Sequence, residues 1–220
     1  MKKTVILLII SIGFAGISFS QDCGYYFGQK KGVTFRRANY IGTSSKPSSY
    51  LEDKIIDIQP DKVTVETQSY DKDNKAVDKN DFSMTCNNGV YKIDFATMLV
   101  SEGGNFKITG DNLEFPSNLS VGMTMNEAKV KLTSSNAMMN MDMRIYNRKV
   151  EAKESIKTPA GTFECYKIVS TTETIPAVMP TMKITSKSIL WIDVKNGNIK
   201  MENYDQAGKL SSSSILESIK

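Results

Sequence analysis

The most distinctive side chains of this sequence are methionine thioethers. Twelve methionines occur in 220 residues, and eight of them fall between Met123 and Met182. Met139, Met141 and Met143 recur at every second position, which on a β-strand places three thioethers ~6–7 Å apart on one face. Thioethers are polarizable and adaptable, so such a row can pack a core, line an apolar binding site or ligate a soft metal.

These three interpretations make different demands on the rest of the sequence. A packed core face requires nothing further, because a β-protein needs apolar rows of this kind. An adaptable apolar cavity would accommodate acyl chains or a hydrophobic peptide. Copper(I) sites normally add histidine or cysteine ligands, and the chain contains no histidine. We therefore expect no metal site and keep the core and cavity interpretations open.

The residue types present do not indicate a catalytic site. Without histidine, the chain cannot build a Ser-His-Asp triad, a Cys-His dyad or a His-ligated zinc site. No glycine-rich phosphate loop and no C-x-x-C motif occurs. The acidic run 71–74 lacks the glycine and glutamate of a calcium loop, and Ser69 and Lys72 match a Ser-x-x-Lys spacing outside any expected helix. We expect no catalytic residues, no cofactor and no enzyme activity.

If the methionine row lines a cavity, apolar residues on neighbouring strands should line it too. The candidate ligand-binding residues are Val130, Leu132, Met139, Met141, Met143 and Trp191. Their role would be to supply packing area to a lipid or another hydrophobic ligand. The alternative is a structural or interaction module that assists the assembly or anchoring of surface proteins. Such a module would have a core filled by its own side chains and an envelope protein as its partner.

The N-terminus has the organisation of a secretory signal. Two lysines precede an apolar run that ends at Phe19, and the small residue Ser20 places cleavage before Gln21. The apolar run is shorter than the ~20 residues that a membrane span needs. We predict a signal peptide over 1–20 and a single β domain over 21–220, with no membrane span after cleavage.

Charge and the first cysteine bear on the partners of the exported chain. Cleavage would leave 26 basic and 24 acidic residues, and this small excess argues against nucleic acid as a partner. Cys23 follows the apolar run closely enough to suggest a lipoprotein. However, acylation sites favour a small residue before the cysteine, and the charged Asp22 stands there. We therefore expect a cleaved, soluble protein.

Three cysteines in an exported chain predict one disulfide and one remaining thiol. Cys165 lies within an apolar, strand-like segment, where a small buried thiol is expected. We favour a Cys23–Cys86 disulfide, which would fix the N-terminus to the fold. The sequence alone allows all three pairings.

The elements that must position these residues are β-strands, because the dominant hydrophobic period is two. One short helix is expected over 94–101, begun by Asp94 and ended by the glycines at 103 and 104. Extended segments are expected over 33–38, 54–58, 62–67, 82–86, 90–95, 106–109, 113–116, 123–133, 138–146, 149–157, 163–174, 182–194, 199–204 and 210–218. This pattern predicts a mainly β fold in which one antiparallel sheet curls around its own core.

The C-terminal third carries a recognisable set of motifs. The segment TPAGTFECYKI over 158–168 is followed by Trp191, by GNIKME over 197–202 and by Gly208. Together with segments 22–35, 86–90 and 110–123, this arrangement resembles the TapB-type family of exported bacterial proteins, whose function is largely unknown. The resemblance implies a half-barrel similar to the lipoprotein carriers LolA and LolB. It implies no catalytic residues, and a location in the periplasm or cell envelope of a Gram-negative bacterium.

Overall fold

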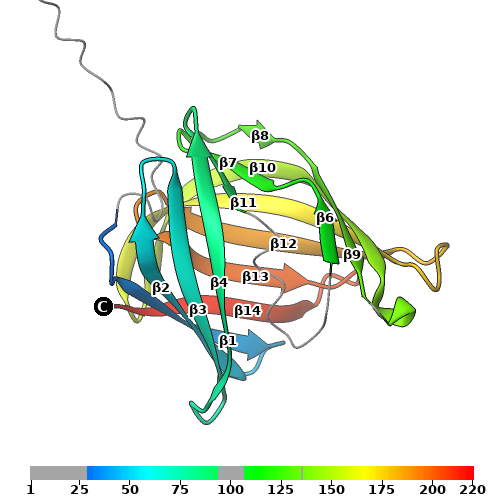
Figure 1. Cartoon of the computed structure of the whole chain (residues 1–220), viewed down its shortest axis with the longest axis horizontal. Coiled ribbons are helices and arrows are strands. Elements are labelled where there is room, and N and C mark those ends of the chain that lie inside the picture. Colours follow the sequence, from blue (N-terminus) through cyan, green and yellow to red (C-terminus); the bar gives the residue numbers. More distant parts are fainter. Residues whose placement is uncertain (1–28, 94–106, 135) are drawn as a thin grey trace, which may run out of the picture.

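The computed structural model describes residues 29–93, 107–134 and 136–220 (Figure 1). The predicted signal peptide over 1–20, Cys23 and the predicted helix over 94–101 lie outside the described residues. Within the described part, the secondary structure is almost entirely β, with a short 3-10 helix at Ala137–Met139. No helix among the described residues combines the length and hydrophobicity that a membrane crossing requires.

Fourteen strands form one sheet among the described residues. They are β1 Thr34–Ile41, β2 Ser49–Ile58, β3 Lys62–Asp71, β4 Ala76–Asn87, β5 Val90–Ile93, β6 Lys107–Gly110, β7 Leu113–Pro116, β8 Thr124–Met125, β9 Ala128–Thr133, β10 Met141–Thr158, β11 Gly161–Pro176, β12 Ile184–Asp193, β13 Gly197–Tyr204 and β14 Leu210–Ile219. The sheet order is β6-β9-β10-β11-β12-β13-β14-β1-β2-β3-β4-β5-β7, and β8 pairs with β10.

Every strand pair in this sheet is antiparallel, and most neighbours follow one another in the chain. In Figure 1 the strands β1–β4 cross in front of β10–β14 at a steep angle, so the sheet curls around an interior without closing. These observations confirm the predicted mainly β fold with a single curled antiparallel sheet.

Local sequence explains why the strands begin, end and alternate where they do. Along β9, the apolar residues at 128, 130 and 132 are buried, whereas the lysines between them are exposed. The β4–β5 hairpin turns at Asn88 (φ 52°) and Gly89 (φ 72°), two residue types that tolerate the left-handed conformation of such a turn. The period-two pattern thus sets which face of each strand is buried.

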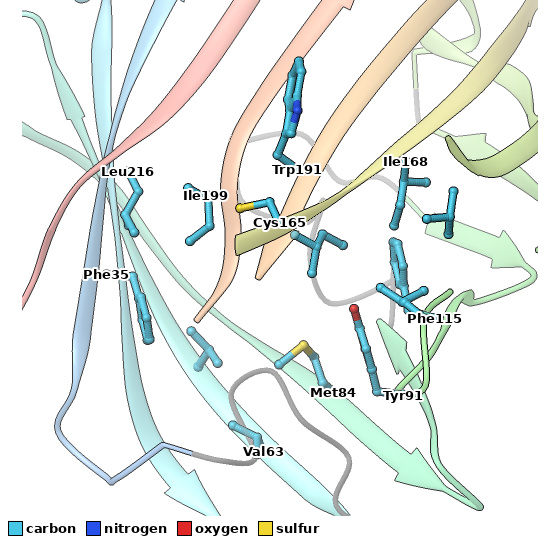
Figure 2. Close-up of a cluster of buried hydrophobic side chains, with 14 of the residues drawn as sticks. Phe35, Val63, Met84, Tyr91, Phe115, Cys165, Ile168, Trp191, Ile199 and Leu216 are labelled. Atoms are coloured by element: carbon cyan, nitrogen blue, oxygen red, sulfur yellow. The ribbon is translucent and has the colours of Figure 1, made fainter. Parts of the chain in front are cut away.

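The hydrophobic core lies on the concave face of the curled sheet (Figure 2). Phe35, Ile55, Val63 and Met84 project from β1–β4 and are each 0% exposed. They belong to one cluster with Val150 and further buried residues of β10–β14. One part of the concave face is therefore filled by the protein's own side chains.

A buried ion pair lies within this core. Arg37 Nη1 is 2.5 Å from Asp53 Oδ2, and both side chains are almost completely buried. Thr67 Oγ1 donates a 2.7 Å hydrogen bond to Asp53 Oδ1, and Arg37 Nε donates to the Asn198 carbonyl at 3.1 Å. The pair links β1, β2, β3 and β13 across the interior.

The long strand β10 changes the face that it buries halfway along. The sequence predicted separate strands over 138–146 and 149–157, but Met141–Thr158 forms one strand. Asn147 adopts a left-handed conformation (φ 52°), and the pairing with β11 shifts register between Tyr146 and Lys149. This bulge adds a residue without ending the strand, so odd-numbered residues face the interior before it and Val150 does so after it.

The two edges of the sheet are connected by a very short crossing. Strand β6 pairs with β9 at one edge, and β7 pairs with β5 at the other, with only Asp111 and Asn112 between β6 and β7. Gly110 (φ 128°) stands where a Cβ would overlap the Lys129 carbonyl oxygen. The chain can therefore pass from one edge to the other only with glycine at this position. We call the gap between β7 and the β8–β10 region the seam.

Candidate functional site

Four of the six predicted ligand-binding residues lie together on neighbouring strands. Met141 on β10 pairs directly with Leu132 on β9, and Met143 pairs with Val130. Val130 and Leu132 are buried, and the two methionines are half-buried. Ile145 continues the row. We call these five residues the methionine patch.

The methionine patch faces the same side of the sheet as the core. Met143 pairs with Thr174, and Thr174 shares a face of β11 with Ile168 because six residues separate them. No register shift interrupts the β11–β12 pairing over this stretch, and Ile168 belongs to the buried core. The members of the patch are nevertheless outside the core cluster and its packed neighbours. The patch is a second apolar region of the concave face.

Uncharged polar side chains cover the concave face beside the methionine patch. They are Ser170, Thr172 and Thr174 on β11, Ser186 and Ser188 on β12, Asn203 on β13, and Ser212 and Ser214 on β14. Ser188 Oγ donates to Asn203 Oδ1 at 2.7 Å, and Asn203 Nδ2 donates to Ser212 Oγ at 3.0 Å. We call this set the hydroxyl belt. The charged residues Glu173, Lys187 and Glu202 alternate with its members and so lie on the opposite face.

Trp191 lies in the buried core and not with the methionine patch, where the sequence-based expectation placed it. The residue is 6% exposed and belongs to the hydrophobic core cluster. On β12 it pairs with Lys167 of β11 and Lys200 of β13. Its indole Nε1 donates to Glu154 Oε1, and Lys200 Nζ lies 4.6 Å from the ring centre. Figure 2 shows Trp191 among the buried side chains of this cluster.

Met139 also departs from the expected row. The residue ends the 3-10 helix Ala137–Met139 instead of lying on β10, and its side chain is exposed. Asn136 Oδ1 accepts a 3.1 Å hydrogen bond from the Met138 backbone N–H, a capping contact that favours a helical turn here. The strand begins at Met141, so the row contains two methionines and not three.

A cavity of about 430 Å³ lies beside β9 and β10, and most of the residues that line it face away from the methionine patch. Its walls come from β6, β9, β10 and β11, and Val130 and Met143 are among the residues that line it. The charged residues that alternate with them along β9 and β10 also contribute, namely Lys129, Lys131, Asp142 and Arg144. Glu173 of β11 pairs with Arg144 and also lines the cavity, so the cavity opens on the outer face of the sheet and not on the face of the methionine patch.

A second cavity of about 430 Å³ lies at the seam and contains a buried arginine. Arg148 is 3% exposed, and its guanidinium donates to the Asn126 carbonyl at 2.9 Å and the Glu114 carbonyl at 2.8 Å. The same group lies 4.8 Å from the centre of the Phe115 ring. Burial lowers the pKa of Arg148 to about 10. Within the described residues it has no carboxylate partner, so backbone carbonyls and an aromatic face hold its charge.

The described residues do not assemble a catalytic or metal-binding centre. No group of three or more histidine, cysteine, aspartate or glutamate side chains is placed to hold a metal ion in the described part of the chain. Cys165 is a buried free thiol, and burial raises its pKa to about 12. A thiol with such a pKa remains protonated at neutral pH and is a poor nucleophile. The predicted Cys23–Cys86 pairing stays a prediction, because Cys23 is outside the described residues.

Sequence reasoning missed the hydroxyl belt and the seam arginine. The belt has a signal, because residues 170–174 form an unbroken polar run within a segment expected to be a strand, so both faces of the strand are polar there. No sequence signal marks Arg148 as buried, because the residue follows a bulge that exchanges the inner and outer faces of β10. Without the bulge, the alternation from Met143 would place Arg148 with the solvent-facing residues.

Comparisons with known proteins agree with this fold. A candidate lipoprotein from Parabacteroides distasonis ATCC 8503 is 26% identical, with 90% of this chain and 100% of that chain covered and a TM-score of 0.76. A candidate exported protein with a YmcC-like fold from Bacteroides fragilis NCTC 9343 is 19% identical, with 90% and 100% covered and a TM-score of 0.73. No protein of curated function matches the sequence. The DUF3108-like family model matches residues 30–216, and the chain belongs to this family.

Proposed function

We propose that this protein is a non-enzymatic component of the Gram-negative cell envelope that binds a lipid or another hydrophobic ligand on the concave face of its curled sheet. The observation that carries the proposal is the methionine patch, in which Val130–Met143 and Leu132–Met141 pair outside the packed core. Half-buried methionines outside the packed core give adaptable apolar surface that the protein's own core does not use.

The hydroxyl belt adds chemistry for the polar part of such a ligand. Its side chains present hydroxyl and amide groups that both donate and accept hydrogen bonds, and none of them is charged. An acyl chain would lie against the methionine patch, and an uncharged polar group of the same molecule would meet the belt. A lipid with hydroxyl or amide groups in its head group fits this arrangement.

Two further observations support an envelope location and a role without catalysis. One similar structure is that of a candidate lipoprotein and another that of a candidate exported protein, as expected for a chain with a predicted signal peptide. The resemblance to the TapB-type family and to the half-barrel carriers LolA and LolB points in the same direction. The complete lack of histidine and the buried Cys165 thiol leave the usual nucleophile and base chemistry without its residues.

A direct test uses the neutral apolar probe N-phenyl-1-naphthylamine, whose fluorescence rises in apolar sites. We expect the purified exported protein to bind the probe, and Met143→Asp to abolish binding because a carboxylate would enter the apolar patch. Val77→Asp on β4 is the matched control, since Val77 is exposed and far along the sheet from β10. Met143→Trp keeps the site apolar but fills it, so it should also weaken binding. This second variant keeps the test decisive if Met143→Asp fails to fold.

Native mass spectrometry of protein purified without detergent provides the second measurement. An added mass that disappears on organic extraction and is missing from Met143→Asp supports a bound lipid. A bare mass, together with no probe binding by the parent protein, would overturn the proposal. Probe binding that Met143→Asp and Met143→Trp leave unchanged would overturn it as well.

A structural or interaction module is the second candidate function, and the filled core favours it. Phe35, Ile55, Val63 and Met84 leave no exposed surface on their part of the concave face. If the methionine patch were equally filled, the protein would act through its outer surface on an envelope partner. The bare-mass outcome above would select this function.

A further inference from the structure

A cluster of exposed apolar side chains occupies one end of the molecule, outside the proposed ligand site. Its members come from the 3-10 helix, from the loop between β11 and β12 and from the first residue of β12, and we call them the tip patch: Met138, Met139, Val178, Met179, Met182 and Ile184. Met138 is 74% exposed and Met179 is 51% exposed. Figure 1 shows both segments projecting at the right-hand end of the curled sheet. Exposed apolar clusters of this kind mark interaction surfaces, whereas single exposed apolar residues do not.

Backbone hydrogen bonds hold the two segments of the tip patch together. The Ala177 N–H donates to the Asn140 carbonyl at 2.9 Å, which joins the β11–β12 loop to the end of the 3-10 helix. Within the loop, the Met179 N–H donates to Pro176 at 3.0 Å and the Met182 N–H donates to Met179 at 2.9 Å. The apolar side chains are therefore displayed by ordered turns.

Charge is excluded from the tip and concentrated just behind it. Residues 134–141 and 174–182 contain no aspartate, glutamate, lysine or arginine. The adjoining parts of β6, β9, β10, β11 and β12, with their connections, carry six basic residues, Lys107, Lys129, Lys131, Arg144, Lys183 and Lys187, and four acidic ones, Asp111, Glu127, Asp142 and Glu173. Four of the basic residues, Lys129, Lys131, Arg144 and Lys183, form ion pairs with these carboxylates. An apolar tip behind which basic residues predominate is the arrangement of segments that enter the interface of an anionic membrane.

We propose that the tip patch docks on the surface of a lipid bilayer containing anionic lipids. The methionine, valine and isoleucine side chains enter the head-group and acyl boundary, and the basic residues behind them meet lipid phosphates. This docking does not depend on a bound ligand. It would place the β9–β10 end of the concave face next to the bilayer, because Met141 pairs with Pro176 at the base of the tip.

The test is flotation of the exported, purified protein with vesicles of phosphatidylethanolamine and phosphatidylglycerol. We expect the parent protein to float with the vesicles, and Met138→Ser/Met179→Ser to lose at least tenfold in apparent affinity. Both side chains are largely in solvent, so the double variant should keep its melting temperature. The matched control is Val77→Ser/Val121→Ser, which removes two exposed apolar side chains from elsewhere and should bind as the parent does.

The contribution of the basic residues behind the tip patch can be tested separately. Lys183→Glu/Lys187→Glu should weaken flotation with the anionic vesicles, and raising the salt concentration should weaken binding of the parent in the same way. Vesicles of phosphatidylcholine alone should bind the parent several-fold less strongly than the anionic vesicles.

Three outcomes would overturn the proposal. The first is a parent protein that does not float with anionic vesicles, and the second is a Met138→Ser/Met179→Ser variant that floats as well as the parent. The third is a parent that ignores vesicles but forms dimers that the same variant abolishes, which would assign the tip patch to self-association.

Discussion

The guanidinium of Arg148 reaches across the seam of the sheet to the backbone carbonyl of Glu114, 2.8 Å away. Arg148 belongs to β10 and Glu114 to β7, two strands that share no ladder of backbone hydrogen bonds. A second bond, to the Asn126 carbonyl, ties the same side chain to the segment between β8 and β9. One arginine thus takes the place of a strand pairing where the curled sheet stays open.

Replacement of Arg148 should loosen the seam more than it lowers global stability. Arg148→Met removes both donors, and two part-buried carbonyls would lose hydrogen bonds to a charged group, which are worth about 1–3 kcal/mol each. Part of that loss is offset because a buried cation is also removed. Hydrogen–deuterium exchange should therefore speed up in peptides covering 113–127, with little change in peptides covering 163–176.

Two variants on the same strand make this measurement specific. Arg148→Lys keeps the charge but lacks the planar fork that serves two acceptors, so its effect should be intermediate. Arg144→Met removes an exposed arginine that pairs with Glu127, and it should leave the seam unchanged. Equal exchange over 113–127 in Arg148→Met and the parent would contradict the role of the arginine.

The buried Arg37–Asp53 pair should matter far more for stability than the surface ion pairs. Asp53→Ala leaves the Arg37 guanidinium buried without its carboxylate, an arrangement that typically costs about 3–5 kcal/mol. Chemical unfolding monitored by circular dichroism measures this loss. The matched control is Asp73→Ala, which breaks the exposed Lys72–Asp73 pair and should leave the unfolding free energy nearly unchanged, because solvent screens such pairs. Similar losses in the two variants would show that the core tolerates an unpaired arginine.

Gly110 should tolerate no side chain. Its φ of 128° lies in a region that other residues rarely adopt, and a Cβ would overlap the Lys129 carbonyl oxygen. We expect Gly110→Ala to shift β6 away from β9 and to lower the melting temperature by several degrees. Gly122→Ala is an informative comparison, because Gly122 also has a positive φ but has open space around it. If Gly110→Ala lowers the melting temperature no more than Gly122→Ala does, the close approach of the Lys129 carbonyl oxygen is not the cause of the destabilisation.

The strands and their turns could be predicted from the sequence because those signals are local. Alternation of lysine with alanine, valine and leucine over 128–132 is sufficient to place β9 and its buried face. The same alternation predicted that Met141 and Met143 share a face, which the pairing with β9 confirms. Val130 and Leu132 could be predicted as neighbours of this row because they belong to the next strand of a meander.

The remaining features depend on events that alternation cannot reveal. Asn147 inserts a bulge into β10 and so turns Arg148 inward, although asparagine there would equally suit a turn between two strands. Trp191 was expected among the ligand-binding residues, but it is buried in the core cluster, where its indole donates to Glu154 of β10. Contacts between strands that are distant along the chain, and not local pattern, decided this position.

The Cys165 thiol gives the protein a specific response to alkaline pH. Burial raises its folded-state pKa from the ordinary value of 9.0 to about 12. The folded state therefore holds this proton more tightly than the unfolded state does. The resulting stabilisation is complete below about pH 9 and is lost as the pH rises toward 12, by up to about 1.4 kcal/mol per pH unit between the two pKa values.

Urea unfolding at pH 7, 9 and 10.5 can isolate this contribution. Cys165→Ala should lower stability at pH 7, because it leaves a small cavity, but its stability should fall less steeply above pH 9 than that of the parent. The difference between the two slopes removes the contribution of lysines and tyrosines, which both proteins share. In the parent, iodoacetamide at pH 8 should label Cys165 only after unfolding, since burial blocks access to the thiol. Parallel slopes for the two proteins, or fast labelling of Cys165 in the folded protein, would contradict a buried, protonated thiol.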